Sequence, residues 1–253
     1  NLTSMSKDEK ADFDKNPHKY KLHYYYGVFD IKLESLKEDV VAMPGAVDLS
    51  RIRNAKYVLG LILTYHINYG LTTRQTSSIL WDVHNIKVSH QTVANYAASA
   101  ARVIRPYVDD YPYELSDSIA VCGDETYIRI SGKRHYVFFM MDAIKKIITS
   151  YSIFLNRDEV SKEYRWLKQV IERLNRTFKG VYRDKNGFNS FERANEFMAL
   201  FAAFFNFLRR HQALSYNVPV SIPELEEMPD MPSKWLRLLR LSYDHLEDLQ
   251  RSA

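Results

Sequence analysis

The sequence predicts an α/β protein in which an all-α helix-turn-helix segment precedes a small sheet with further helices. Three observations lead to this prediction. Apolar residues recur at three- and four-residue steps over 55–104, as in amphipathic helices. Runs rich in β-branched residues then fill 119–155, and the turn Ser131-Gly132 separates the first two of them. A helical pattern follows over 160–178, and a strongly apolar one over 188–208.

The composition is that of an ordinary globular protein. Of 253 residues, 46% are hydrophobic and 26% are charged, which excludes a disordered chain. The formal net charge of +4 says little about nucleic acid by itself. Cys122 is the only cysteine, so a disulfide framework and a cysteine-based zinc site are excluded. No apolar run reaches the roughly 18–20 residues of a membrane span, so we expect no membrane partner.

Residues 55–110 are expected to form a helix-turn-helix DNA-binding domain. Thr72 and Gln75 have the spacing of a capping box, which predicts a helix start. The next turn is expected at His84-Asn85, and Ser89 is the expected N-cap of the following helix. Pro106 and Pro112 then indicate a linker, and the proline-broken tail over 216–253 is expected to end in a short helix.

The second helix of such a unit presents its N-terminal part to base edges in the major groove. Val93 and Tyr96 are expected to point inward, and Gln91 or Asn95 has the chemistry for a bidentate contact to adenine. The alternatives are a three-helix scaffold with a polar surface and a helical dimer interface. The expected DNA contacts of the unit are Arg74, Ser89, His90, Gln91, Thr92 and Asn95.

A helix around Glu172 has a strongly basic face. Residues 165–185 contain seven basic and two acidic residues, a local charge of +5 that exceeds that of the whole chain. One interpretation is a solvated face whose ion pairs each stabilise the helix by about 0.2–0.5 kcal/mol. The other is a metal-binding carboxylate on a surface that binds phosphates. The basic residues at helical spacing around Glu172 are Arg165, Lys168, Arg176, Lys179 and Arg183.

Asp124 lies inside an apolar strand pattern beside Gly123, where aspartate is disfavoured. It fits an edge or bulge position, or a rigid Mg²⁺ ligand on a strand. Glu125 should point to the opposite face of the strand, because strand side chains alternate. The histidines lack metal-site spacing, and we expect His84, His90, His135 and His211 at the surface or against phosphates.

Four segments, taken in order, resemble insertion-sequence transposases. The resemblance spans roughly residues 55–220. It is found in Leu71-Thr72-x-Arg74 with Val88-Ser89-His90-Gln91-Thr92-Val93, in Gly123-Asp124-Glu125-Thr126-Tyr127 with Met141-Asp142, in Ile171-Glu172 through Lys179, and in Phe205-Asn206-Phe207-x-Arg209-Arg210-His211.

This resemblance implies an RNase H-like core with a mixed sheet at 117–215 and an Asp-Asp-Glu triad. Such enzymes use two Mg²⁺ ions to cleave DNA at terminal inverted repeats and to join it to target DNA. Carried over by position, Asp124 is the first aspartate, Glu172 is the glutamate, and Arg176 and Lys179 hold DNA phosphates. The resemblance also implies a homo-oligomer on DNA and a cytoplasmic, nucleoid-associated protein of a prokaryote.

The chain departs from the family pattern at the second aspartate. Asp124 and Glu172 are 48 residues apart, and no strand-borne aspartate lies between them. Asp142 corresponds to a different aspartate of the family, and Asp158 is a poor substitute. We therefore expect a sheet reduced to about three strands, and a transposase-like DNA-binding protein without strand transfer. The alternatives are a non-enzymatic DNA-binding remnant and a helix-turn-helix regulator with a small α+β ligand domain. The role of 1–54 is open.

Overall fold

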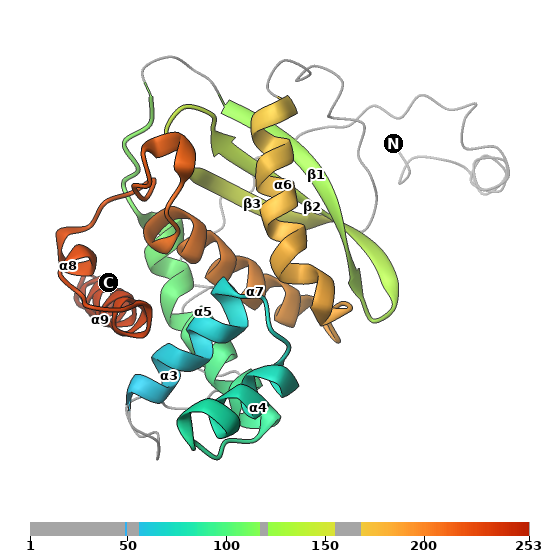
Figure 1. Cartoon of the computed structure of the whole chain (residues 1–253). Helices are drawn as coiled ribbons and strands as arrows, with labels where there is room; N and C mark the ends of the chain where they lie inside the picture. Colours follow the sequence, from blue (N-terminus) through green and yellow to red (C-terminus); the bar gives the residue numbers. More distant parts are fainter. Residues whose placement is uncertain (1–48, 50–55, 117–120, 155–167, 253) are drawn as a thin grey trace, which may run out of the picture. The chain divides into compact units, whose positions relative to one another are not determined.

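The computed structural model describes residue 49 and residues 56–116, 121–154 and 168–252, without the side chains of 121–125 and 168–171. The predicted N-terminal segment therefore lies outside the described residues, apart from Leu49. Within the described part, seven α-helices accompany one three-stranded antiparallel sheet (Figure 1). These elements belong to one compact unit, Pro44–Ala253.

The sheet consists of β1 (Val121–Ile130), β2 (Lys133–Asp142) and β3 (Ile148–Phe154) in the order β1-β2-β3. All three strands lie within the predicted region 119–155, and the predicted turn Ser131-Gly132 separates the first two. The expectation of a mixed sheet is wrong for the described strands, which are antiparallel throughout. The reason is that short turns join consecutive strands, whereas a parallel neighbour needs a crossover of a dozen or more residues.

The described residues form seven α-helices. They are α3 (Lys56–Leu63), α4 (Thr73–His84), α5 (His90–Asp110), α6 (Lys168–Tyr182), α7 (Phe191–Ala203), α8 (Pro223–Glu226) and α9 (Met231–Arg251). Two π-helical turns follow α3 and α7, η3 (Thr64–Asn68) and η7 (Phe204–Leu208). Single 3₁₀ turns are η6 (Arg183–Lys185) and η8 (Gln212–Leu214). None of the helices described here is both long and apolar enough to cross a membrane.

The predicted linker at Pro106 is wrong, because α5 continues through that proline to Asp110. A proline inside a helix costs roughly 3 kcal/mol, since it removes one hydrogen bond and crowds the preceding turn. Ile104 and Val108, on either side of Pro106, are both buried. Burying two such side chains contributes a comparable free energy, which keeps the helix intact.

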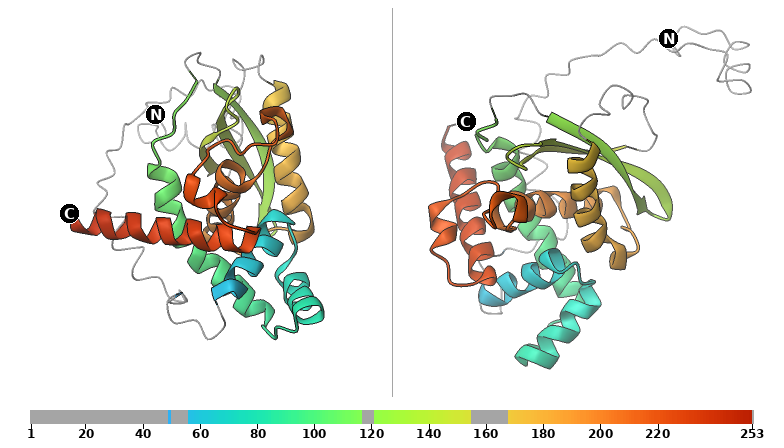
Figure 2. Two further views of the ribbon diagram at one scale, coloured as in Figure 1. Left: turned by 60° about the vertical axis from the view of Figure 1, so that its left-hand side comes forward. Right: turned by 45° about the horizontal axis from the view of Figure 1, so that its top comes forward.

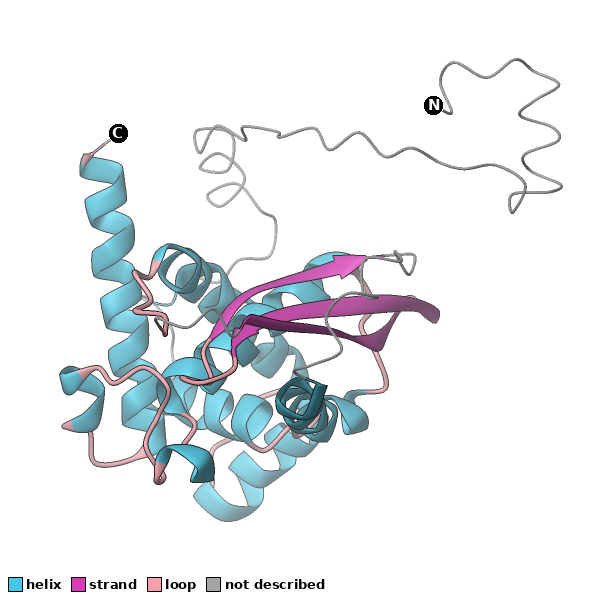
Figure 3. Ribbon diagram, turned by 90° about the horizontal axis from the view of Figure 1, so that it is seen from above, coloured by secondary structure: helices cyan, strands magenta, loops and turns pink. Residues whose placement is uncertain are grey.

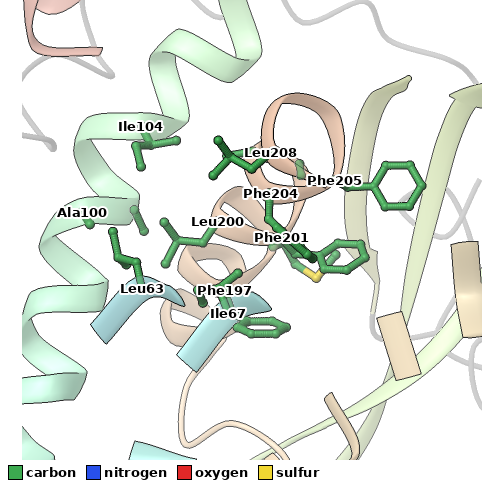
Figure 4. Close-up of a cluster of buried hydrophobic side chains, with 14 of the residues drawn as sticks. Leu63, Ile67, Ala100, Ile104, Phe197, Leu200, Phe201, Phe204, Phe205 and Leu208 are labelled. Atoms are coloured by element: carbon green, nitrogen blue, oxygen red, sulfur yellow. The ribbon is translucent and has the colours of Figure 1, made fainter. Parts of the chain in front are cut away.

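Helix α7 is buried on all sides from Phe197 to Ala203, and this part links the helical layer to the sheet. A helix that is apolar all round belongs in a core. Leu200 and Leu208 point toward Ala100 and Ile104 of α5, whereas the rings of Phe201 and Phe205 point toward the strands (Figure 4). The Phe201 ring centroid lies 5.9 Å from that of Phe139 on β2. The core is therefore continuous from α5 through α7 to the sheet.

The two faces of the sheet differ sharply. Thr126, Ile128, Val137, Phe139 and Ile153 are buried, and their strand neighbours on the opposite face are exposed or half-buried. The described helices lie on one side of the sheet, as Figures 2 and 3 show. The alternation follows from the two-residue period of a strand, so the register assigns each residue to a covered or an open face.

The Asn206 side chain hydrogen-bonds the turn η7 to the start of β3. Its carboxamide oxygen accepts a hydrogen bond from the Ile148 amide at 2.8 Å, and its carboxamide nitrogen donates to the Ile148 carbonyl at 2.8 Å. The same nitrogen donates to the Tyr113 hydroxyl at 3.2 Å. In the closing segment, residues 209–217 after η7, His211 is buried, so the expected surface position is wrong. Burial, with Arg209 nearby, lowers the pKa of His211 to about 4.

Replacing Gly60 with alanine is expected to destabilise the fold by about 1–3 kcal/mol, because helices α3 and α9 approach closely there. A Cβ atom at position 60 would lie 2.3 Å from the Pro232 carbonyl oxygen. Gly180 on α6 is the matched control, since a Cβ there would meet nothing within 4 Å. Gly180→Ala should stabilise by up to about 1 kcal/mol. Urea unfolding of both variants checks the pair, and equal effects would contradict the close approach.

Candidate nucleic-acid interface

Local hydrogen bonds fix the first turns of α4 and α5. Thr72 and Gln75 form the predicted capping box, in which the Gln75 amide donates to the Thr72 hydroxyl at 3.2 Å. Ser89 caps α5 and accepts from the Thr92 amide at 3.0 Å. Asn85 ends α4 in the left-handed conformation, with φ of 54°. The predicted helices, caps and turn of this unit are confirmed.

The predicted DNA contacts on α5 differ in how free their polar groups are. Val93 and Tyr96 are buried as expected, while His90 and Gln91 are exposed. The Ser89 and Thr92 hydroxyls hydrogen-bond to each other at 2.9 Å as part of the cap. The Gln91 side chain donates to the carboxamide oxygen of Asn95 at 3.0 Å. His90 and Gln91 are therefore best placed to meet a ligand, and Asn95 holds Gln91 in position.

A cavity of about 620 Å³ adjoins these first turns. Arg74 from α4, with His90 and Gln91 from α5, lines one part of it. Lys185 and Arg193, which follow α6 and begin α7, line another part. Arg193 forms an ion pair with Glu196 at 2.9 Å. The first turns of three helices lie around this cavity, and the free amides and dipole of a helix N-terminus favour an anion.

Lys185 connects η6 to the loop between η3 and α4. Its ammonium nitrogen donates to the carbonyl oxygens of His66 and Leu71 at 2.9 and 3.0 Å. It also lies 5.0 Å from the centre of the Phe197 ring. Burial lowers the pKa of Lys185 to about 7, against an ordinary value of 10.5. Burial, with Lys185 close by, lowers the pKa of His66 to about 3.

Replacing Lys185 with methionine is expected to remove a pH dependence of stability between about pH 7 and 9. In this window the unfolded chain holds the lysine proton and the folded chain releases it, because the folded pKa is about 7. The free energy of unfolding of the unchanged protein should therefore rise with pH relative to that of the variant. Urea unfolding at several pH values measures this difference, and parallel profiles for the two proteins would contradict it.

The basic face of α6 is described only in part. Glu172, Arg176 and Lys179 are exposed, and Leu174 and Phe178 are buried, as the helical pattern predicts. Arg183 follows the helix in η6 and pairs with Asp184 at 3.3 Å. The remaining two predicted cations cannot be placed on this face, since Arg165 and the side chain of Lys168 lie outside the described residues.

Two contacts fix the direction of α6 along β1. The Arg129 amide donates to the Tyr182 hydroxyl at 2.7 Å. Three helical residues earlier, the Lys179 nitrogen lies 5.5 Å from the ring centre of Tyr127. Helix and strand therefore run in the same direction, and Figure 1 shows α6 alongside β1.

This alignment brings the backbone of position 124 level with Glu172. Glu172 lies ten residues before Tyr182, which is about 15 Å at 1.5 Å per helical residue. Position 124 lies five residues before Arg129, which is about 17 Å at 3.3 Å per strand residue. The two predicted catalytic positions therefore lie at the same height along β1 and α6, which are neighbours.

A two-metal Mg²⁺ site does not fit the described residues. It needs a bridging carboxylate and several further oxygen ligands, and the described part of the chain, which leaves out the side chain of Asp124, has no group of three or more acidic, histidine or cysteine side chains that could hold a metal ion. Asp142 is not available, because its carboxylate accepts from Ser116, Ile144 and Lys145. Burial would raise the pKa of Asp142, but these bonds lower it overall. Asp158 lies outside the described part of the chain.

Comparisons with known proteins add no relative. No protein-family model, no curated protein and no solved structure matches the chain. The residues that the sequence analysis missed are Lys185 and Arg193 in the cavity. The hydrogen bonds of Lys185 to His66 and Leu71 join residues 119 and 114 apart. Arg193 lines the cavity with Arg74 and His90, which lie more than 100 residues before it, so no spacing in the sequence signals either cation.

Proposed function

We propose that the chain is a DNA-binding protein of the insertion-sequence transposase type that has lost strand transfer. The support is structural and local. The first turns of α4 and α5 place Arg74, His90 and Gln91 around one cavity with Arg193 and Lys185. Cations and helix N-termini in one place suit a backbone phosphate, and an adjacent exposed carboxamide suits a base edge. This arrangement is the observation on which the proposal depends.

Positions 124 and 172 lie at the same height along the neighbouring elements β1 and α6. This alignment supports the transposase type over an unrelated helix-turn-helix protein. A transposase active site needs carboxylates from a strand and from a neighbouring helix, and β1 and α6 supply such a pair of positions. Two carboxylates hold one Mg²⁺ ion weakly and do not hold a close pair of ions. Strand transfer on transposon-end DNA with Mg²⁺ or Mn²⁺ is therefore expected to give no product, and a joined product would overturn the inactive assignment.

Replacing Arg74 with alanine is expected to weaken duplex DNA binding and to flatten its salt dependence. Loss of one phosphate contact should reduce the slope of log affinity against log salt by about 1. Gln91→Ala should instead cost about 1–3 kcal/mol for the preferred sequence and relax its choice of base. Fluorescence anisotropy with labelled duplexes measures both effects.

The matched control is Arg251→Ala, which removes an exposed cation in the last turn of α9, outside the cavity. This variant should bind duplex DNA as the unchanged protein does. Equal losses for Arg74→Ala and Arg251→Ala would show only a general charge effect and would remove the role assigned to the first turns of α4 and α5.

A regulator with a small-molecule ligand is the second candidate, and the cavity volume favours it. Ligand pockets measure roughly 300–1,000 Å³, and this cavity measures about 620 Å³ beside the first turn of α5. In that case a small anion in the cavity should change DNA affinity. If added phosphates and carboxylates change duplex affinity no more than an equal ionic strength of simple salt does, the second candidate is excluded and the first remains.

A further inference from the structure

The open face of the sheet presents aromatic side chains that no described element covers. Tyr127 on β1 is 51% exposed, Phe154 on β3 is 44% exposed and Met140 on β2 is 39% exposed. Tyr136 and Phe138, also on β2, are half-buried. The described helices pack on the other face of the sheet, as Figure 3 shows. Exposed apolar side chains gathered in one patch indicate a binding surface.

Three of the aromatic rings form a row across the full width of the sheet. The register pairs Tyr127 with Tyr136, and Tyr136 with Phe154. Directly paired residues share a face, with Cβ atoms about 4.5–5.5 Å apart. The next row on this face holds Phe138 opposite Ser152. Three rings therefore lie side by side in one row, and the next row holds one ring and one small polar side chain.

The charge around this face is mainly positive. Arg129 and Arg134 are the exposed charged side chains of the described strand residues on this face, whereas Lys133 pairs with buried Ile130 on the covered face. Position 125, an acid, pairs with Phe138. The guanidinium of Arg134 lies 5.0 Å from the Tyr127 ring centre, and Lys179 of α6 lies 5.5 Å from it. Tyr127 thus joins the open face to the basic face of α6 over the β1 edge.

We propose that this open face binds single-stranded nucleic acid by stacking unpaired bases on Tyr127, Tyr136 and Phe154. Aromatic side chains on a sheet stack bases, and cations beside them hold the phosphates. This site and ligand differ from those of the duplex interface, and the inference does not rest on duplex binding by α4 and α5.

Charge favours nucleic acid over a second copy of the chain as the occupant. An isologous dimer through this face would bring the same patch of both copies together. The cations Arg129 and Arg134 of both copies would then gather in one interface, where like charges at close range repel. A polyanion with flat apolar bases meets both the rings and the cations.

Fluorescence anisotropy with a labelled single-stranded oligothymidine tests the proposal. Tyr127→Ser and Phe154→Ser should each weaken its binding by about 5- to 100-fold, and both should leave duplex binding unchanged. Arg74→Ala should show the opposite pattern, so failure of this site and failure of the duplex interface are distinguishable. Trp81→Ser on α4 is the matched control, since this ring is also 50% exposed but lies away from the sheet, and its single-strand affinity should not change.

Photo-crosslinking of a bromouracil-containing single strand to the unchanged protein provides a readout that does not depend on a variant folding. The crosslinked peptides should contain Tyr127, Tyr136 or Phe154. Crosslinks confined to α4 and α5, or equal losses for Tyr127→Ser and Trp81→Ser, would overturn the proposal. The proposal would also be overturned if the protein did not bind the single strand but formed a concentration-dependent dimer that Phe154→Ser abolishes. A second copy of the chain would then be the occupant of the open face.

Discussion

Replacing Phe178 with alanine is expected to lower the free energy of unfolding by about 3–5 kcal/mol. The ring of Phe178 is fully buried, and its centroid lies 5.3 Å from Phe139, 5.2 Å from Phe201 and 6.3 Å from Phe197. Truncation would leave a cavity where α6, α7 and the sheet meet. The same change should loosen α6 on β1, which brings positions 124 and 172 to one level.

Urea unfolding and thermal melting measure this effect. A loss of 3–5 kcal/mol corresponds to roughly 6–20 °C in melting temperature for a chain of this size. Thr177→Ala is the neighbouring control, because this half-buried side chain only donates to the Arg173 carbonyl within its own helix. It should change stability by about 0.5 kcal/mol or less. A Phe178→Ala effect no larger than that of the control would contradict the packing of α6 on the sheet.

Asn206→Leu is expected to destabilise the protein by about 2–6 kcal/mol, although both side chains are branched and have four heavy atoms. The Asn206 carboxamide accepts a hydrogen bond from the Ile148 amide and donates one to the Ile148 carbonyl, and the side chain is fully buried. Leucine would leave two buried backbone groups without partners, at about 1–3 kcal/mol each. The start of β3 would lose its attachment to η7.

Hydrogen exchange of the Ile148 amide reports this loss directly, alongside urea unfolding. Faster exchange at Ile148 with little change at Phe139, in the middle of the sheet, is the expected pattern. Asn217→Leu, at an exposed asparagine of the same closing segment, is the control and should be nearly neutral. Unchanged exchange at Ile148 would show that Asn206 does not hold the strand.

Local structure could be predicted from the sequence where a few neighbouring residues determine it. The caps at Thr72 and Ser89 and the strand pairing around Ser131 depend on short-range hydrogen bonds and turn chemistry, and they are confirmed. Pro106 shows the limit, because tertiary burial of its neighbours outweighs the local preference of proline. The antiparallel pairing of β3 with β2 was not predicted, because no turn motif like Ser131-Gly132 stands between these strands.

The candidate site could be predicted only in part, for the same reason. Asp124, Glu172 and the basic face of α6 follow from residue type and helical spacing. The alignment of positions 124 and 172 along β1 and α6 depends on the Arg129–Tyr182 contact, which joins residues 53 apart. The cavity depends on Lys185 reaching the loop before α4, over more than 100 residues. The aromatic row also follows from the strand register, since single exposed rings in a sequence are ordinary.

The salt dependence of duplex DNA binding tests the central claim most directly. Anisotropy titrations of the full chain with a labelled duplex, from about 50 to 200 mM salt, give the slope of log affinity against log salt. The proposal predicts binding with a slope of about −3 or steeper, reduced in magnitude by about 1 in Arg74→Ala. No binding at the lowest salt, or a slope that Arg74→Ala leaves unchanged, would contradict it.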